Sequence, residues 1–149
     1  MRAKLGNFLT QRHEGTKKKG KNLTTSLFLL AAAATALNCG DAQSQAEMTM
    51  CAARDYQVAD KELNKQWPKT LAVMKEKDRY PQPAYDKGPS YSAALLASQR
   101  AWLAYRDAQC LADGYSARGG TMQPMLVYGC KARLTDERVG QLKAMADVN

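Results

Sequence analysis

Histidine and cysteine are the side chains that most directly suggest chemistry in this sequence, which has one histidine and four cysteines. The only histidine is His13, which lies in a basic N-terminal segment. Without a second histidine, the rest of the chain cannot form a Ser-His-Asp or Cys-His nucleophile site or a histidine-ligated metal centre. Thirteen acidic side chains follow residue 36, but their spacing singles out no pair for glycoside hydrolysis. The sequence therefore predicts no enzyme, no metal site and no cofactor.

The four cysteines are expected to form disulfide bonds. An even number of cysteines in a short exported chain is typical of a disulfide framework, and the absence of a C-x-x-C pair disfavours zinc or thioredoxin-like redox chemistry. Three connectivities are possible, and loop closure favours the local pairs Cys39 with Cys51 and Cys110 with Cys130. Each bond is expected to stabilise the domain by about 2 to 4 kcal/mol. A free reactive thiol is the alternative.

Residues 1–36 have the order of features of a secretory signal peptide. Basic residues precede the apolar run 27–34, and a small-residue site ends at Ala36. We expect cleavage after Ala36, which leaves one domain of residues 37–149 in the periplasm or outside the cell, with no membrane span. A retained membrane anchor and lipidation at Cys39 are the alternatives. The polar Asn38 before Cys39 disfavours lipidation.

Most of the positive charge belongs to this N-terminal segment. The whole chain has a net charge of +8, but residues 1–36 hold seven Lys or Arg and one Glu. The remaining 113 residues carry 15 basic and 13 acidic side chains, a net charge of +2. Nucleic-acid binding needs a clustered basic surface, so we expect no nucleic-acid partner.

Hydrophobic periodicity predicts three helices and an all-α fold. Apolar residues recur at steps of three and four in residues 43–67, 91–112 and 122–146. Pro68 is expected to end or kink the first helix before a short helical stretch at 71–77. Tyr91, Leu95, Trp102 and Tyr105 are expected to share one side of the second helix. We predict a three-helix hairpin or small bundle joined by two disulfides.

Two connections are expected between these helices. Residues 80–90 contain three prolines and a glycine, which is typical of a loop. Gly114, Gly119 and Gly120 break the chain a second time, and Thr121 is a candidate N-cap of the third helix, with Pro124 in its first turn. In that helix a narrow heptad-like stripe is expected from Met125, Tyr128, Ala132, Thr135, Val139, Leu142 and Ala146.

Several motifs resemble the LprI-like lysozyme-inhibitor family of exported bacterial proteins. They are the segment from Cys39 to Met48 leading to Cys51-Ala52, then Ala59-Asp60 and Glu62-Leu63-Asn64, the run from Ser98 to Cys110, Gly119-Gly120-Thr121 with Pro124-Met125 and Cys130, and Leu134-Thr135 with Arg138 and Leu142. The pattern Q-R-A-W-x-x-Y-R-D-A-x-C within them is specific; it contains Gln99, Arg100, Trp102, Tyr105, Arg106 and Asp107. The resemblance implies a small, helical, disulfide-bonded exported protein, with lysozyme inhibition attributed to a founding member.

Helical spacing gives this motif two interpretations. Trp102 and Arg106 are four residues apart, so Arg106 can lie along the Trp102 ring or reach a carboxylate of the first helix, Asp60 or Glu62. The structural interpretation is a buried polar network that fixes helix register. The functional interpretation is a recognition patch centred on Trp102, Tyr105 and Arg106.

The loop between the first two helices offers a different binding surface. Its tyrosines and prolines provide rigid contact area, and Tyr85, Asp86 and Lys87 lie at its expected tip. Lys87 can place an ammonium group against the catalytic carboxylates of a lysozyme. The alternative is a plain connector. Three function classes follow: an inhibitor that binds a lysozyme or related muramidase, a general cell-envelope interaction module, and, least favoured, a wall-active enzyme.

Overall fold

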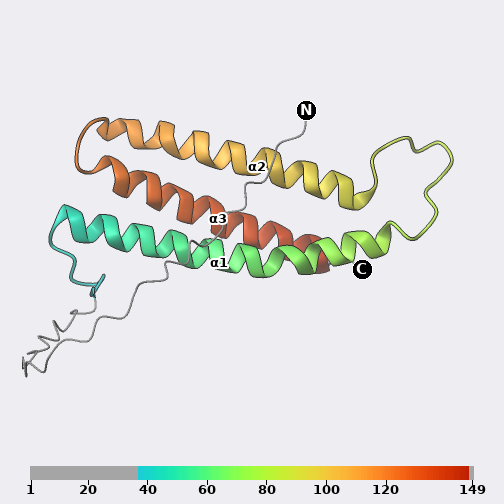
Figure 1. Cartoon of the computed structure of the whole chain (residues 1–149), viewed down its shortest axis with the longest axis horizontal. Coiled ribbons are helices and arrows are strands. Elements are labelled where there is room, and N and C mark those ends of the chain that lie inside the picture. The colour runs from blue at the N-terminus through green and yellow to red at the C-terminus, as the bar shows by residue number, and fades with distance from the viewer. Residues whose placement is uncertain (1–36, 148–149) are drawn as a thin grey trace, which may run out of the picture. The chain divides into compact units, whose positions relative to one another are not determined.

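The described part of the protein is a bundle of three long α-helices. A computed structural model describes residues 37–147, with α1 at Gln45–Lys77, α2 at Tyr91–Gly114 and α3 at Gln123–Asp147. A short 3-10 helix, η1 (Tyr115–Ala117), follows α2 directly. The helices run up, down and up, so α1 and α3 are parallel and α2 is antiparallel to both (Figure 1). The predicted all-α, three-helix fold is confirmed, and this part of the chain contains no strand.

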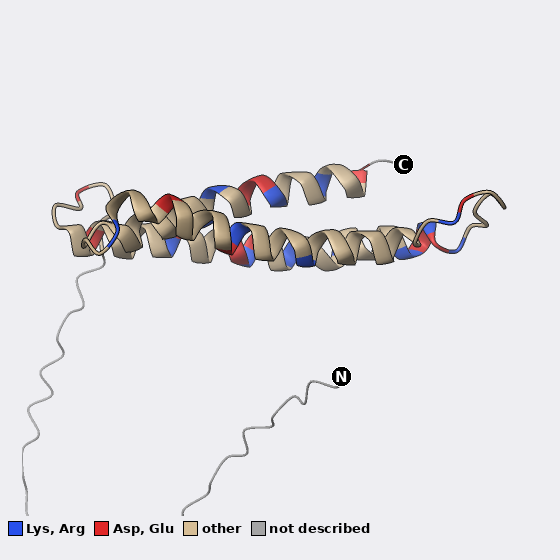
Figure 2. Ribbon diagram, turned by 90° about the horizontal axis from the view of Figure 1, so that it is seen from above, with Lys and Arg blue, Asp and Glu red and all other residues tan. Residues whose placement is uncertain are grey.

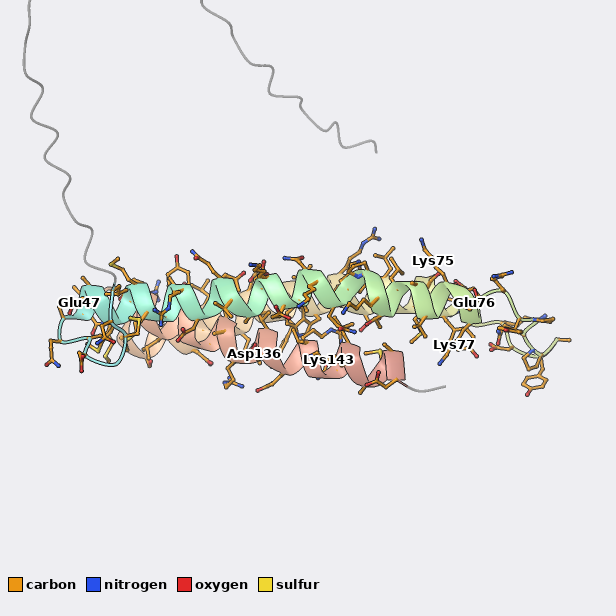
Figure 3. All side chains as sticks on the ribbon, turned by 90° about the horizontal axis from the view of Figure 1, so that it is seen from below. Glu47, Lys75, Glu76, Lys77, Asp136 and Lys143 are labelled. Atoms are coloured by element: carbon orange, nitrogen blue, oxygen red, sulfur yellow. A yellow bond between two sulfur atoms is a disulfide. The ribbon has the colours of Figure 1, made fainter. Side chains whose placement is uncertain are left out.

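Side-chain capping determines where α1 begins, and positively charged residues stabilise its C-terminal end. The Ser44 side chain accepts a hydrogen bond from the Glu47 backbone N–H, and the Glu47 carboxylate accepts from the Ser44 backbone N–H at 2.8 Å. The backbone N–H of Gln43 also donates to the Glu47 carboxylate. The hydrogen bonds from the Ser44 and Gln43 backbones hold the pKa of Glu47 below its usual value. Lys75 and Lys77 occupy the last turn, where positive charge interacts favourably with the helix dipole (Figure 3).

The sequence predicts that the first helix ends or kinks at Pro68, and the prediction of an end is wrong. α1 continues through Pro68 to Lys77, so the expected separate stretch at 71–77 belongs to the same helix. A proline removes one helical hydrogen bond, but packing on both sides of it compensates. Trp67 and Leu71 both contact the main core cluster, and this contact holds the residues on either side of Pro68 in one helix.

The core lies along the axis of the bundle. Leu63, Leu95, Val139 and Leu142 form its main cluster, with Leu142 fully buried. The Thr70 hydroxyl donates a 2.9 Å hydrogen bond to the Leu142 backbone carbonyl and links α1 to α3 inside this core. α3 packs extensively along α1 and less extensively against α2, while α1 and α2 contact each other least.

The predicted stripes of α2 and α3 are only partly correct. Leu95 is buried and Trp102 is half-buried, but Tyr91 and Tyr105 are exposed, because the buried side of α2 runs through Gln99 and Arg106. On α3, the buried positions are Cys130, Leu134, Thr135, Arg138, Val139 and Leu142. The polar residues Gln99, Arg106 and Arg138 are therefore buried, whereas Ala132 and Ala146 of the predicted stripe are only partly buried.

The turn between η1 and α3 uses glycine as expected, but not Thr121. Gly119 has a positive φ of 77°, a left-handed conformation that favours glycine. α3 begins at Gln123, so the prediction that Thr121 caps it is wrong. Instead the Gln123 side-chain oxygen accepts a 2.9 Å hydrogen bond from the Gly119 N–H. Pro124 lies in the first turn, where its missing N–H costs nothing.

Both predicted disulfides are present. Cys39 is bonded to Cys51, and Cys110 is bonded to Cys130. The first joins the N-terminal tail to α1, and the second joins α2 to α3 across the glycine turn. A sulfur in a disulfide cannot also hold a thioether-linked lipid, so the bond at Cys39 argues against lipidation at that residue. The predicted signal peptide lies outside the described residues.

None of the helices in residues 37–147 combines the length and the apolar character that a bilayer span requires. Lys and Arg are interspersed with Asp and Glu along the helices (Figure 2).

Candidate functional site

Arg106 forms the centre of a cluster of aromatic and acidic side chains. The residue is only 5% exposed, and its guanidinium carbon lies 5.3 Å from the centre of the Tyr56 ring and 5.2 Å from that of Trp102. Its Nη1 atom lies 3.6 Å from Asp60 Oδ1 on α1. The predictions that Arg106 lies along Trp102 and reaches Asp60 are both confirmed. Glu62, the other candidate, pairs with Lys65 instead.

Asp107 extends this cluster to α3. Its carboxylate accepts a 3.1 Å hydrogen bond from Arg106 Nε and lies 3.0 Å from Lys131 Nζ. Burial alone raises the pKa of Asp107, but the hydrogen bonds from Lys131 and Arg106 and the attraction of both cations outweigh it, so the pKa lies below its usual value. Lys131 also lies 5.8 Å from the Tyr56 ring centre, and Tyr56 stacks with Tyr128.

This pKa shift predicts an acid-sensitive contribution to stability. A carboxylate with a lowered folded-state pKa stabilises the fold above its unfolded pKa, and the contribution disappears as the pH falls from about 4 through the folded-state pKa. We expect Asp107→Asn to lower the free energy of unfolding at pH 7 by up to about 1 kcal/mol, because the group is half exposed. The difference from wild type should shrink below pH 4 in urea titrations at several pH values. Asp136→Asn, an exposed α3 variant, is the control; a difference for Asp107→Asn that does not change with pH would contradict the prediction.

A second buried arginine lies on the other side of Trp102. Arg138 on α3 is 5% exposed and lies 5.8 Å from the Trp102 ring centre. It donates hydrogen bonds to Gln99 Oε1 at 3.0 Å, Gln141 Oε1 at 2.9 Å and Ser98 Oγ at 3.0 Å. Within residues 37–147 no carboxylate pairs with it, and burial lowers its pKa. The sequence patterns predict no specific role for Arg138, although its position between Thr135 and Leu142 on the buried stripe indicates a buried arginine.

The family-motif residues therefore divide into two groups. Gln99, Trp102 and Arg106 point into the bundle and link all three helices, which supports the structural interpretation of the motif. Arg100, Tyr105 and Asp107 are exposed, and Tyr105 retains 54% of its surface. Because Arg106 is buried, it is not available as part of an exposed recognition patch.

The loop of residues 78–90 is the most exposed segment that the sequence singled out. Every residue from 79 to 90 is exposed, and Tyr85 retains 87% of its surface. The loop extends beyond the ends of the helices (Figures 1 and 2). At its foot, the Asp78 carboxylate accepts a hydrogen bond from the Ser92 backbone N–H, and hydrogen bonds from Ser92 lower the pKa of Asp78.

Asp86 has a structural role in this loop. Its carboxylate accepts a 2.8 Å hydrogen bond from the Gly88 N–H, and its own N–H donates to the Pro83 carbonyl at 2.9 Å. This local turn presents Lys87, which makes no ion pair within the described residues. Of the three predicted contact residues, Tyr85 and Lys87 are free to contact a partner, while Asp86 shapes the turn between them and the second helix.

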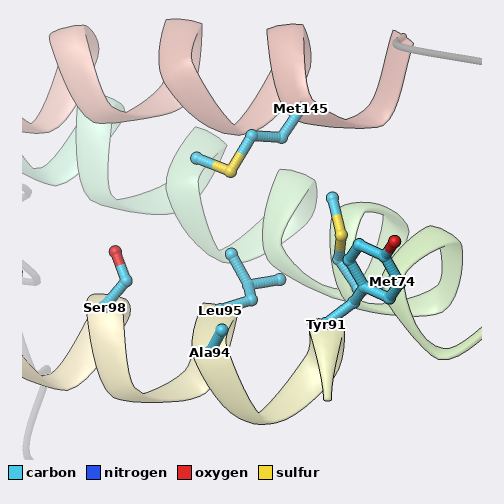
Figure 4. Close-up of a pocket in the computed structure, with 6 residues that line it drawn as sticks. All are labelled: Met74, Tyr91, Ala94, Leu95, Ser98 and Met145. Carbon is cyan, nitrogen blue, oxygen red and sulfur yellow. The ribbon is translucent and has the colours of Figure 1, made fainter. Parts of the chain in front are cut away.

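An apolar cavity of about 280 Å³ lies next to the foot of the loop. It is lined by Met74, Tyr91, Ala94, Leu95, Ser98 and Met145, which come from all three helices (Figure 4). Met74 and Tyr91 flank the loop in sequence, so the cavity and the loop belong to the same end of the bundle.

In residues 37–147 no three His, Cys, Asp or Glu side chains gather as metal ligands.

Comparisons with known proteins agree with this architecture. A family model described as lysozyme inhibitor LprI matches residues 37–142. An uncharacterized protein of Rhizobium meliloti (strain 1021) is 43% identical over 113 residues, which cover 74% of this chain and 79% of that protein. The crystal structure of a DUF1311 family protein from Pseudomonas putida KT2440 has a TM-score of 0.57 at 23% identity, covering 69% of this chain and 94% of that chain, which supports the fold alone. Because the family model matches more than half of its residues, the chain belongs to the LprI lysozyme inhibitor family.

Proposed function

We propose that this protein is exported and that it binds a lysozyme and blocks its substrate cleft with the loop of residues 78–90. The observation that carries the proposal is the 87% exposure of Tyr85 on a protruding loop, in a member of an inhibitor family. Tyrosine is enriched at the energetic centres of protein interfaces. The two disulfides support export, because such bonds persist in oxidising compartments.

The loop has the properties of a preorganised contact. Pro81, Pro83 and Pro89 restrict its backbone, which reduces the entropy lost on binding. Tyr85 supplies rigid amphipathic area, and Lys87 supplies an ammonium group that makes no ion pair with any residue of 37–147. Lysozymes cleave their substrate with two carboxyl groups in a cleft. We propose that Lys87 enters that cleft while Tyr85 packs on its rim.

Net charge does not drive this interaction. Lysozymes of animals are basic, so long-range attraction requires an acidic inhibitor, whereas residues 37–149 carry a net charge of +2. Local complementarity at the loop must therefore supply the affinity. We expect the inhibition constant to change little with ionic strength.

Tyr85→Ala is expected to weaken lysozyme inhibition by about 30-fold, the effect of losing one interface hot spot. Lys87→Ala is expected to weaken it further when combined with Tyr85→Ala. The measurement is the inhibition constant for peptidoglycan hydrolysis by lysozymes of several types. Both side chains are exposed and outside the core, so the circular dichroism spectrum and melting temperature should not change.

Tyr105→Ala is the matched control, because it removes an exposed tyrosine from the family motif rather than from the loop. If Tyr105→Ala abolishes inhibition while the loop variants inhibit normally, the exposed face of α2 is the binding surface and the loop is a connector.

A general cell-envelope interaction module is the second candidate function. The cavity beside the loop favours it, because an apolar cavity of about 280 Å³ can accept a side chain from many partners. Failure to bind any lysozyme type, together with loop-dependent binding of another envelope protein, would support this candidate over inhibition.

A further inference from the structure

A second concave site lies between α1 and α2, away from the loop. It has a volume of about 220 Å³ and is lined by Asp60, Leu63, Asn64, Trp67, Gln99 and Leu103. Its position follows from the packing of the bundle, because α1 and α2 contact each other least and leave space between them. Apolar and aromatic walls with a few oriented polar groups are typical of a small-molecule site.

Hydrogen bonds inside the protein orient two of the polar groups in this groove. Gln99 Oε1 accepts from Arg138 Nε at 3.0 Å, which fixes the carboxamide and leaves its Nε2 as a donor. No residue of the described chain accepts a hydrogen bond from that nitrogen. Asn64 Nδ2 donates to Asp60 Oδ2 at 2.9 Å, which leaves Asn64 Oδ1 as an acceptor. The groove therefore offers an oriented donor on one wall and an oriented acceptor on the other.

The charge of the groove favours a neutral ligand. Among the described residues that line the groove, Asp60 alone is charged, and its carboxylate already lies 3.6 Å from the buried Arg106. A second cation would gain little from a carboxylate that is already compensated. Hydroxyl groups, in contrast, can accept from Gln99 and donate to Asn64.

We propose that this groove binds one pyranose ring of a neutral saccharide. A pyranose carries hydroxyls at its edge and an apolar C–H face, and Trp67 with Leu63 and Leu103 provides the apolar and aromatic walls for that face. The volume matches one ring rather than a longer oligosaccharide. The groove uses Gln99 of the family motif, so the motif both supports the bundle and shapes a ligand site.

The test is a titration of the mature domain with N,N′-diacetylchitobiose, maltose and lactose, without any lysozyme present. We expect saturable changes in the NMR signals of the Trp67 indole N–H and the side-chain amides of Gln99 and Asn64, with millimolar affinity for at least one sugar. Because lysozyme is absent, the result does not depend on the proposed inhibitory function.

Three variants define the site. Asn64→Ala, at an exposed position, is expected to raise the dissociation constant about fivefold, the effect of one lost hydrogen bond. Trp67→Leu is expected to abolish binding, and Trp67→Phe to restore part of it, which separates loss of the aromatic wall from loss of folding. Gln57→Ala, which removes an exposed carboxamide two turns before Asn64 on α1 and outside the groove lining, is the matched control and should bind as wild type does.

Two outcomes would overturn the proposal. One is the absence of saturable changes at these three residues with every sugar. The other is binding of the cation L-argininamide at the same residues when no sugar binds, which would identify the groove as a site for basic side chains of a protein partner.

Discussion

Replacing Cys110 and Cys130 together with alanine is expected to lower the free energy of unfolding by about 4 kcal/mol. The bond closes a segment of 20 residues, and its loss increases the entropy of the unfolded chain. Both cysteines are also buried in a cluster with Leu134 and Val127, so the alanine variant loses packing as well. Urea unfolding followed by circular dichroism at 222 nm measures the change.

Cys39→Ala with Cys51→Ala is the matched comparison. It removes the other disulfide, but it releases only the N-terminal tail, which can detach without unfolding the bundle. We expect a loss of about 2 kcal/mol or less from this pair. Equal losses from the two pairs would contradict the prediction that the bond between α2 and α3 stabilises the bundle more than the bond between the N-terminal tail and α1.

Arg106→Ala is expected to lower the free energy of unfolding by about 3 kcal/mol. The substitution removes the guanidinium between the rings of Tyr56 and Trp102 and leaves Asp60 and Asp107 without that cation. Both carboxylates are partly exposed, so water solvates them after the arginine is removed. The expected loss of unfolding free energy therefore lies at the low end of the range for breaking a buried ion pair. Chemical denaturation at pH 7 is the measurement.

Two further variants test whether the loss of stability depends on the position of Arg106 and on the planar shape of its guanidinium group. Arg100→Ala removes an exposed arginine from the same helix and is expected to change stability by less than about 0.5 kcal/mol. Arg106→Lys keeps the charge but loses the planar group that lies against both rings, so we expect an intermediate loss. An Arg106→Lys variant as stable as wild type would show that charge alone, and not ring contact, accounts for the effect.

The local features of the fold were predictable from the sequence. The three helices follow from hydrophobic steps of three and four residues, and the loop at 80–90 follows from its prolines and glycine. Both disulfides join residues that are close in sequence, for which loop closure is favourable. The contact of Arg106 with Trp102 was predictable because one helical turn separates the two residues. Its contact with Asp60 was one of only two options on the first helix.

The predictions that failed required knowledge of what packs against each helix. Pro68 by itself disfavours a helix, and only the contacts of Trp67 and Leu71 with the main core cluster keep α1 continuous. Tyr105 and Trp102 have similar apolar character, so the sequence could not show that one is exposed and the other half-buried. That difference depends on where α3 lies against α2.

The sequence by itself determined the helices, the loop and the disulfide pairs, because each depends on interactions between residues near one another in the chain. Only the tertiary structure decided the buried polar contacts. Arg138 donates a hydrogen bond to Gln99, which is 39 positions away in the sequence, and Thr70 donates one to the carbonyl of Leu142, which is 72 positions away. Such contacts depend on the register in which whole helices pack, and register results from the sum of many small packing energies that no local pattern encodes. The oriented amide of Gln99, and with it the groove between α1 and α2, exists for that reason.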